Sequence, residues 1–360
     1  MNTHTSIRPA VRYWLLAGVI MVFFQVVIGG VTRLTDSGLS ITEWAVIQGT
    51  LPPMNEAQWQ KAFEAYKVAA RKQYETLHAD MTLGEFKVIF FWEYIHRLWA
   101  RLMGLVFLVP FLFFWAKKWI PKWLIARLGI VIFLATLAAT FGWIMVASGL
   151  NDDTRTWVSA YKLIIHLLIA TFLFGVLFWT WLLSNGRPPA EEYSRRIRRW
   201  GWSLSAVLLV QIALGGLMAG MRAGLVHPHF PFFIHGQSLL DALSARDGAS
   251  IGSWIDYEPA LSVKAWAQVA HRTFAYLLTI LILALLLKLH KWNPSAQLIK
   301  AAWLLFAALF LQFLLGVLTV ISCIGRVPVT YGVLHQGGAL LLLAALLYLT
   351  YRGGFSGRKA

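Results

Sequence analysis

Eight long apolar segments alternate with short basic or turn-forming stretches along the chain. Each has roughly the 20 residues that an α-helix needs to cross the hydrocarbon core of a bilayer. The predicted spans are residues 13–31, 87–115, 125–147, 160–184, 201–220, 263–290, 299–321 and 330–351. We therefore predict an all-α polytopic membrane protein with eight transmembrane helices.

Composition and charge support this class and give the spans a direction. The chain is 58% hydrophobic and only 13% charged, whereas soluble domains are about a quarter charged. The net charge of +16 is unevenly placed. More than half of the 32 Lys and Arg residues lie in the terminal segments and in the loops 116–127, 185–200 and 288–300, where the only acids are Glu191 and Glu192. Basic loops face the cytoplasm, so both termini are predicted to be cytoplasmic. The charge therefore does not indicate a nucleic-acid partner.

Two long connections, 32–86 and 221–262, are then expected to face outward. The segment from Asn55 to Tyr74 has spaced apolar residues typical of an amphipathic helix. Such a helix either lies on the membrane surface or forms a lid over a site at the outer face.

The same motifs occur in both halves of the chain, in the same order. The matching pairs are Gln25 and Gln211, Gly29 and Gly215, Gly30 and Gly216, His96 and His271, Gly142 and Gly316, and His166 and His335. Such a repeat indicates a duplication of four helices into eight. We expect two tandem four-helix bundles, residues 1–190 and 191–360, related by a pseudo-two-fold axis along the membrane normal.

Four of the ten histidines lie well inside the predicted spans, one in each even-numbered span: His96, His166, His271 and His335. Polar groups inside a membrane are costly and usually functional. A single such histidine is more often an interhelical hydrogen-bond partner, but four at duplicated positions indicate two paired sites near the outer face.

Haem is the ligand that suits two histidines in each half. Zinc would need a third or fourth ligand, and only Glu93 offers one. A proton relay would need carboxylates through the bilayer, which these spans lack. Haem iron accepts two axial imidazoles from facing helices. Arg97 and Arg272 each follow one of the histidines and either pair with haem propionates or extend to the interface.

The halves differ three residues before the first histidine of each pair. Glu93 precedes His96, and Gln268 precedes His271. This spacing places Glu93 on the same helix face as His96, one turn away. A carboxylate in one half and an amide in the other predicts proton-coupled chemistry in the N-terminal site and a permanent electron-transfer haem in the C-terminal site. The alternative is that Glu93 only bonds a neighbour.

Several motifs resemble those of haem A synthases, over nearly the whole chain. They are Gln25–Trp44, Trp92–Arg97, Gly142–Leu150, His271–Thr273 and His335–Gly338. The near absence of cysteine resembles the proteobacterial and mitochondrial branch, because the outer loops lack the cysteine pairs of other members. The single Cys323 is interpreted as a packing residue.

The resemblance implies oxidation of the C8 methyl group of haem O to the formyl group of haem A, the cofactor of terminal oxidases. His96 and His166 would hold the substrate haem, with Glu93 at its reactive edge. His271 and His335 would ligate a haem b. The oxidation would be two successive hydroxylations of one methyl group followed by loss of water. An iron with two histidine ligands has no open position for oxygen, so either one ligand leaves, or electrons are removed and water attacks the activated methyl group with Glu93 as general base.

The resemblance also implies a location and partners. The location is the bacterial inner membrane, where membrane lipid surrounds the chain. The partners are a haem O synthase that delivers substrate, oxidase assembly factors and an electron donor. A homo-oligomer is possible. A di-haem b electron carrier or quinol oxidoreductase module is the main alternative, and a parallel-repeat transporter is a third. The outer-loop residues His227, His229 and His235 are either a metal site or, as we favour, part of a polar loop.

Overall fold

The computed structural model describes residues 7–43, 48–150, 156–245, 258 and 260–354. All regular secondary structure in these ranges is helical. The eight predicted spans are confirmed as long apolar helices: α1 (Pro9–Leu34), α4 (Leu83–Ala116), α5 (Lys122–Ala147), α6 (Ala160–Ser184), α7 (Ser194–Gly220), α9 (Leu261–Lys291), α10 (Ala296–Ile321) and α11 (Val329–Arg352).

Local signals explain where these helices begin. Pro9 occupies the first turn of α1, where a missing backbone N–H removes no helical bond. The α4 helix starts at a capping box, in which the Thr82 side chain accepts from Glu85 N and the Glu85 carboxylate accepts from Thr82 N. This box starts α4 four residues before the predicted apolar span, so the helix extends beyond the hydrocarbon-length segment.

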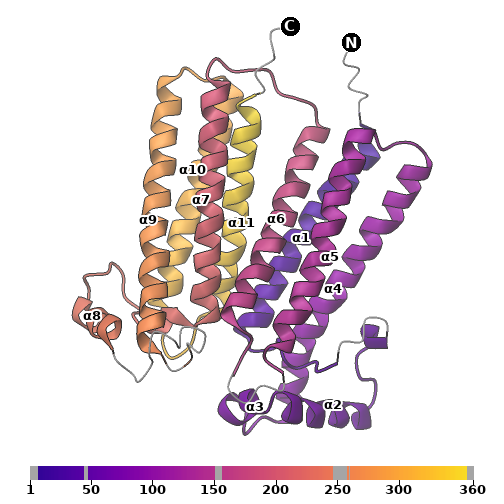
Figure 1. The fold of residues 1–360 in the computed structure, drawn as a ribbon, viewed down its shortest axis with the longest axis vertical. Helices are drawn as coiled ribbons and strands as arrows, with labels where there is room; N and C mark the ends of the chain where they lie inside the picture. Colours follow the sequence, from indigo (N-terminus) through magenta and orange to yellow (C-terminus); the bar gives the residue numbers. More distant parts are fainter. Residues whose placement is uncertain (1–6, 44–47, 151–155, 246–257, 259, 355–360) are drawn as a thin grey trace.

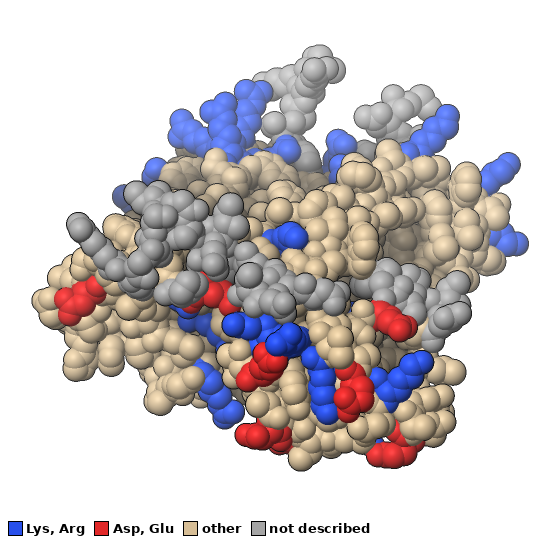
Figure 2. Space-filling view, turned by 60° about the horizontal axis from the view of Figure 1, so that its bottom comes forward, with Lys and Arg blue, Asp and Glu red and all other residues tan. Residues whose placement is uncertain are grey.

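Shorter helices gather at one end of the molecule, in the two long connections. They are η1 (Gln48–Thr50), α2 (Glu56–Ala69), α3 (Arg71–Leu77), η2 (Ala223–Leu225) and α8 (Gly236–Ser244). In Figure 1 this end is at the bottom, and the first turn of α1 and the last turn of α11 lie at the top. Figure 2 turns the loop end forward and shows acidic side chains beside basic ones there, while basic side chains alone gather at the upper edge. This separation of charge is what the predicted orientation requires.

The amphipathic segment predicted over Asn55–Tyr74 is helical and packs onto the start of α4. Asn55 caps α2 by accepting from Gln58 N at 2.9 Å. The ring of Phe63 stacks on Phe86 with centroids 4.9 Å apart, and Tyr66 is fully buried. The apolar face of α2 is therefore used in packing against the protein.

Four helices form the middle of the molecule. Helices α1 and α7 each contact both α6 and α11, and α6 and α11 also touch each other. The outer helices repeat one arrangement: α4 packs on α1 as α9 packs on α7, and α5 packs on α6 as α10 packs on α11. These contacts of one half thus have counterparts in the other half, whereas α9 and α10 touch and the equivalent helices α4 and α5 make at most marginal contact.

Polar contacts join the halves where α1 and α7 end near the long connections. The Arg33 guanidinium donates to the carbonyl oxygens of Ala219 and Gly220, at 3.1 and 3.3 Å. Arg222, at the end of α7, forms an ion pair with Asp36, at the end of α1. The Arg33 bonds use carbonyl groups left free at the end of α7, and together with the ion pair they join the two halves.

Gly220 permits the close approach of α7 to α6, and replacing it should destabilise the protein. A Cβ atom there would lie 2.5 Å from Cβ and 2.8 Å from Cα of Ala160. We expect Gly220→Val to lower the free energy of unfolding by about 1–3 kcal/mol. Thermal unfolding of the detergent-solubilised protein measures this. Gly129→Val is the control, since a Cβ atom at Gly129 meets nothing within 4 Å; equal midpoints for both variants would contradict the packing role.

Candidate functional site

Each of the four intramembrane histidines lies against a glycine of a neighbouring helix. A Cβ atom added to Gly29 would lie 2.9 Å from Cε1 of His96, and the corresponding distance from Gly142 to His166 is 3.1 Å. In the second half, a Cβ atom added to Gly215 would lie 3.3 Å from Cε1 of His271. A Cβ atom added to Gly316 would lie 2.9 Å from Cε1 of His335. A larger residue at any of these glycines would push the imidazole out of place.

In each half, one glutamine on the preceding span contacts the first histidine of the pair. Gln25 Nε2 donates to the His96 carbonyl oxygen at 3.3 Å, and Gln211 Nε2 donates to that of His271 at 3.1 Å. The same amide nitrogens lie 3.1–3.4 Å from the ring nitrogens of these histidines. The sequence marked these glutamines only as signs of duplication; their repeated spacing before the glycines could have identified them as orienting residues.

The C-terminal pair has the separation expected of two axial ligands. The ring centroids of His271 and His335 are 6.3 Å apart, and the rings are inclined at 85°. Two imidazoles that bind opposite sides of one metal at about 2 Å have ring centres about 6 Å apart. In the N-terminal pair, His166 Nδ1 lies 3.0 Å from the Ala138 carbonyl oxygen, which fixes the orientation of its ring.

Glu93 is buried, and both oxygens of its carboxylate accept hydrogen bonds. Its side chain accepts two bonds from Arg97, at 2.6 and 3.1 Å. Its other oxygen accepts from Ser40 Oγ and from the Ile41 backbone N–H, both at 2.8 Å. The outer connection thus holds the carboxylate one helical turn from His96. The contacts of Ser40 and Ile41 with Glu93 were not revealed by the sequence, because loop-to-helix contacts leave no periodic pattern.

Arg97 also fastens this loop, through bonds to two carbonyl oxygens. It donates to Ile41 O at 2.9 Å and to Glu43 O at 3.0 Å. Arg97 therefore has protein partners on the loop side, and its pairing with a haem propionate stays a prediction.

We call the hydrogen bonds between an outer connection and the helix that carries the first histidine of a pair a loop clamp. The second half also has a loop clamp, but its bonding groups differ. Gln268 Nε2 donates to the His227 carbonyl oxygen at 3.0 Å, and Arg272 donates to that of His229 at 2.8 Å. The Arg272 guanidinium also lies 3.9 Å over the ring of Phe232. The propionate role of Arg272 likewise stays a prediction. Where Glu93 accepts from a loop N–H, Gln268 donates to a loop carbonyl, so the second site has no carboxylate at this position.

The outer-loop histidines form a compact group without a metal-binding arrangement. Ring centroids are 5.1 Å apart for His227 and His229, and 4.4 Å apart for His229 and His235. Within the described residues, no group of three His, Cys, Asp or Glu side chains could hold a metal ion. The metal alternative therefore gains no support from the described residues. His227 is also more than part of a polar loop, because it is buried and its carbonyl holds Gln268.

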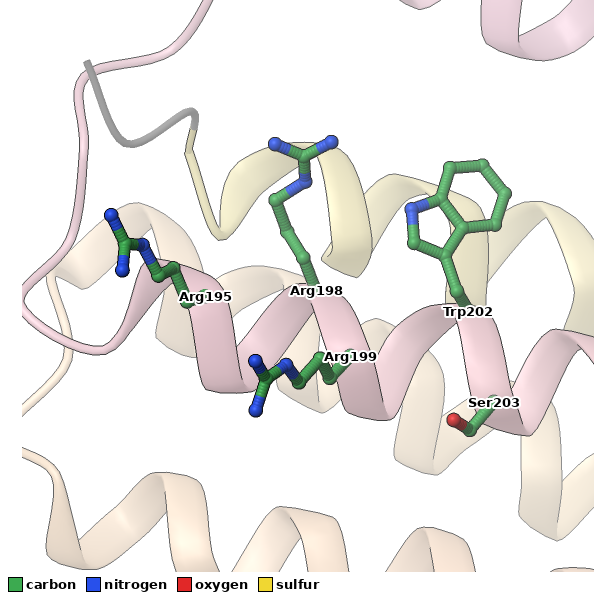
Figure 3. Close-up of a pocket in the computed structure, with 5 residues that line it drawn as sticks. All are labelled: Arg195, Arg198, Arg199, Trp202 and Ser203. Carbon is green, nitrogen blue, oxygen red and sulfur yellow. The ribbon is translucent and has the colours of Figure 1, made fainter. Parts of the chain in front are cut away.

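Two further features lie away from the histidines. A hollow of about 400 Å³ opens near the start of α7, at the opposite end of that helix from Gly215 (Figure 3). Its lining residues are Arg195, Arg198, Arg199, Trp202 and Ser203. Cys323 is buried beside Gly224, and burial raises the pKa of its thiol to about 11, as suits a packing residue.

The fold and the site define a class: a polytopic helical membrane protein with a histidine pair in each half and a buried glutamate beside only one of them. Residues 12–347 match the family model described as cytochrome oxidase assembly protein (COX15-CtaA). The chain belongs to this family.

Curated relatives match almost end to end. A protein of Flavobacterium psychrophilum is 36% identical over 345 residues, which cover 96% of this chain and 98% of the relative. A protein of Bradyrhizobium sp. (strain ORS 278) is 39% identical over 341 residues, covering 94% and 90%. One of Nitrosospira multiformis is 37% identical over 349 residues, covering 96% and 94%. All three are named heme A synthase.

Proposed function

We propose that this protein is a haem A synthase, an oxidoreductase that converts the C8 methyl group of haem O into the formyl group of haem A. The observation that carries the proposal is the unequal pair of otherwise matching sites. Each half holds two histidines against two glycines, but Glu93 stands in one half where Gln268 stands in the other. One site is thereby equipped for proton transfer, and the other for holding a resident cofactor.

The residues present suit haem. Imidazole nitrogens are ligands of haem iron, and the 6.3 Å separation of the His271 and His335 ring centroids suits two imidazoles that share one iron. We assign His96 and His166 to the substrate haem O and the other pair to a haem b. The bound haems supply the redox chemistry.

The protein's own residues orient the substrate and accept a proton during the reaction. His96 and His166 would hold the macrocycle, and the glycines limit how the imidazoles turn. Glu93 Oε2 accepts from Ser40 and Ile41, and Oε1 accepts from Arg97, so both oxygens are held in one orientation. Glu93 would accept the proton released when water attacks the activated methyl group, and Arg97 holds its carboxylate in place through two hydrogen bonds.

The proposal extends to the architecture and its setting. Residues 1–190 form the substrate half and residues 191–360 the haem b half, related by a pseudo-two-fold axis along the membrane normal. The repeated helix contacts support this relation. The basic end, which carries both termini, is cytoplasmic in a bacterial inner membrane, and the haem sites lie toward the outer face. A haem O synthase, oxidase assembly factors and an electron donor are the proposed partners.

The haem content of the purified protein tests this assignment. Protein made in cells that supply haem O should yield haem B together with haem O, a hydroxylated intermediate or haem A. Haem B alone would instead favour the di-haem electron carrier, and the absence of haem would favour a transporter.

The glycines beside the histidines give a site-specific prediction. A side chain at Gly316 would displace the His335 imidazole, because even its Cβ atom would lie 2.9 Å from Cε1. We expect Gly316→Leu to lose haem B while the protein still binds haem O in the other half. Gly104→Leu, where a Cβ atom meets nothing within 4 Å, is the control. Retention of haem B in the Gly316 variant, measured by extraction, would contradict the assignment.

A further inference from the structure

The proposed function requires the two sites to distinguish two haems, and the inference below rests on it. Haem O carries a long isoprenoid chain that haem b lacks. The substrate half must therefore offer apolar space next to its histidines that the cofactor half does not need. The duplication allows the two halves to be compared position by position.

Helices α5 and α10 differ in the two turns that precede the glycine beside the histidine. Gly142 and Gly316 align these helices, since each contacts the second histidine of its pair. The five positions in question carry large side chains in α10: Leu309, Phe310, Gln312, Phe313 and Leu314. The equivalent positions of α5 are all small: Ala135, Thr136, Ala138, Ala139 and Thr140.

In the cofactor half, two of these large side chains, Leu309 and Phe313, pack within the protein, whereas Phe310 and Leu314 are exposed. The Phe313 ring lies 6.3 Å from the ring of Tyr276 on α9 and 6.1 Å from that of Phe230 in the outer connection. Leu309 is buried. Helices α9 and α10 are in contact, so side chains already occupy the space beside His335.

In the substrate half, the corresponding positions carry small side chains, and fewer residues are buried. Ala135 and Ala139 are exposed, and Arg101 stands where Tyr276 stands in the other half. Within the described residues, α4 has no buried residue over 94–113 and α5 has none over 132–147. Helices α4 and α5 make at most marginal contact, although both are described in full.

The exposed face of α5 is chemically suited to an apolar chain. Thr136 and Thr140 each donate their hydroxyl to the carbonyl four residues earlier, at 3.0 Å, which leaves their methyl groups outward. This face also begins at the proposed iron ligand, because the Ala138 carbonyl contacts His166 Nδ1 and Gly142 contacts the same ring.

We propose that Ala135 and Ala139 are specificity-determining residues, which leave the space between α4 and α5 open for the isoprenoid chain of the substrate haem. Leu309 and Phe313 close the same space in the other half and restrict that site to a haem without such a chain. The two halves thus select different haems by the size of equivalent side chains.

Ala139→Phe, which installs the counterpart residue, tests the proposal in cells that supply haem B and haem O. We expect the tail-bearing haems extracted from the full-length protein to fall by at least about tenfold, because the added ring occupies the space of the chain. Haem B should be retained at its wild-type amount or above, which shows that the protein is folded. Ile130→Phe is the matched control, since it adds a ring on the opposite, exposed face of α5.

The reverse variant, Phe313→Ala, gives a gain that misfolding cannot produce. It should let the C-terminal site accept tail-bearing haem and raise the content of such haems above that of wild type. Wild-type content of tail-bearing haem in both variants would overturn the inference while the proposed function stands. A wild-type protein that binds haem O but makes no haem A would instead overturn the proposed function and leave the selection by Ala139 measurable. Wild type with haem B alone would overturn both.

Discussion

Glu93→Gln should abolish haem A formation while leaving both haem sites able to bind. The amide cannot accept a proton, so we expect the rate of haem O oxidation to fall roughly 10²-fold or more. Gln is the conservative choice because Gln268 occupies the equivalent buried position of the other half. Haem extraction over a time course, with haem O synthase co-expressed, measures the loss.

The Glu93 variant also removes a buried ion pair, and this requires a control. Arg97 would keep its bonds to Ile41 O and Glu43 O but lose its carboxylate partner. The double variant Glu93→Gln, Arg97→Gln removes both charges together, so no unpaired buried charge remains. We expect it to be equally inactive and to bind haem B normally. Wild-type activity in either variant would eliminate Glu93 as the proton acceptor.

His271→Ala and His96→Ala should remove different haems. Loss of an axial ligand from the C-terminal pair should deplete haem B and stop turnover, because the electron-transfer site is lost, while haem O still accumulates. Loss of His96 should deplete the tail-bearing haems and leave haem B in place. Absorbance spectra and extracted haems of the two purified variants distinguish these outcomes; identical losses from both would show that the pairs do not define separate sites.

The spans, the histidine pairs and the contrast of Glu93 with Gln268 could be read from the sequence. Span length follows from bilayer thickness, and a duplicated polar residue inside an apolar helix is conspicuous whatever the tertiary packing. The structure added the glycine beside each imidazole. The sequence contained these glycines as repeat markers but could not say which helices would face each other.

The loop clamps could not have been predicted in this way. Contacts such as Ser40 to Glu93 and Gln268 to the His227 carbonyl join an irregular segment to a helix, and no periodicity encodes them. The sequence therefore presented Glu93 as a carboxylate beside a histidine. The structure shows it held by four hydrogen bonds and paired with Arg97. Similarly, the sequence suggested a metal site as one interpretation of the loop histidines. In the structure, the backbone carbonyl of His227 accepts a hydrogen bond from Gln268.

The most direct test of the central claim is conversion of haem O by this chain. Membranes from cells that make haem O but lack any other haem A-forming protein should contain haem A only when the chain is expressed, and haem O alone when it carries Glu93→Gln. Haem O that persists unchanged beside a well-expressed, haem B-containing wild-type protein would contradict the account.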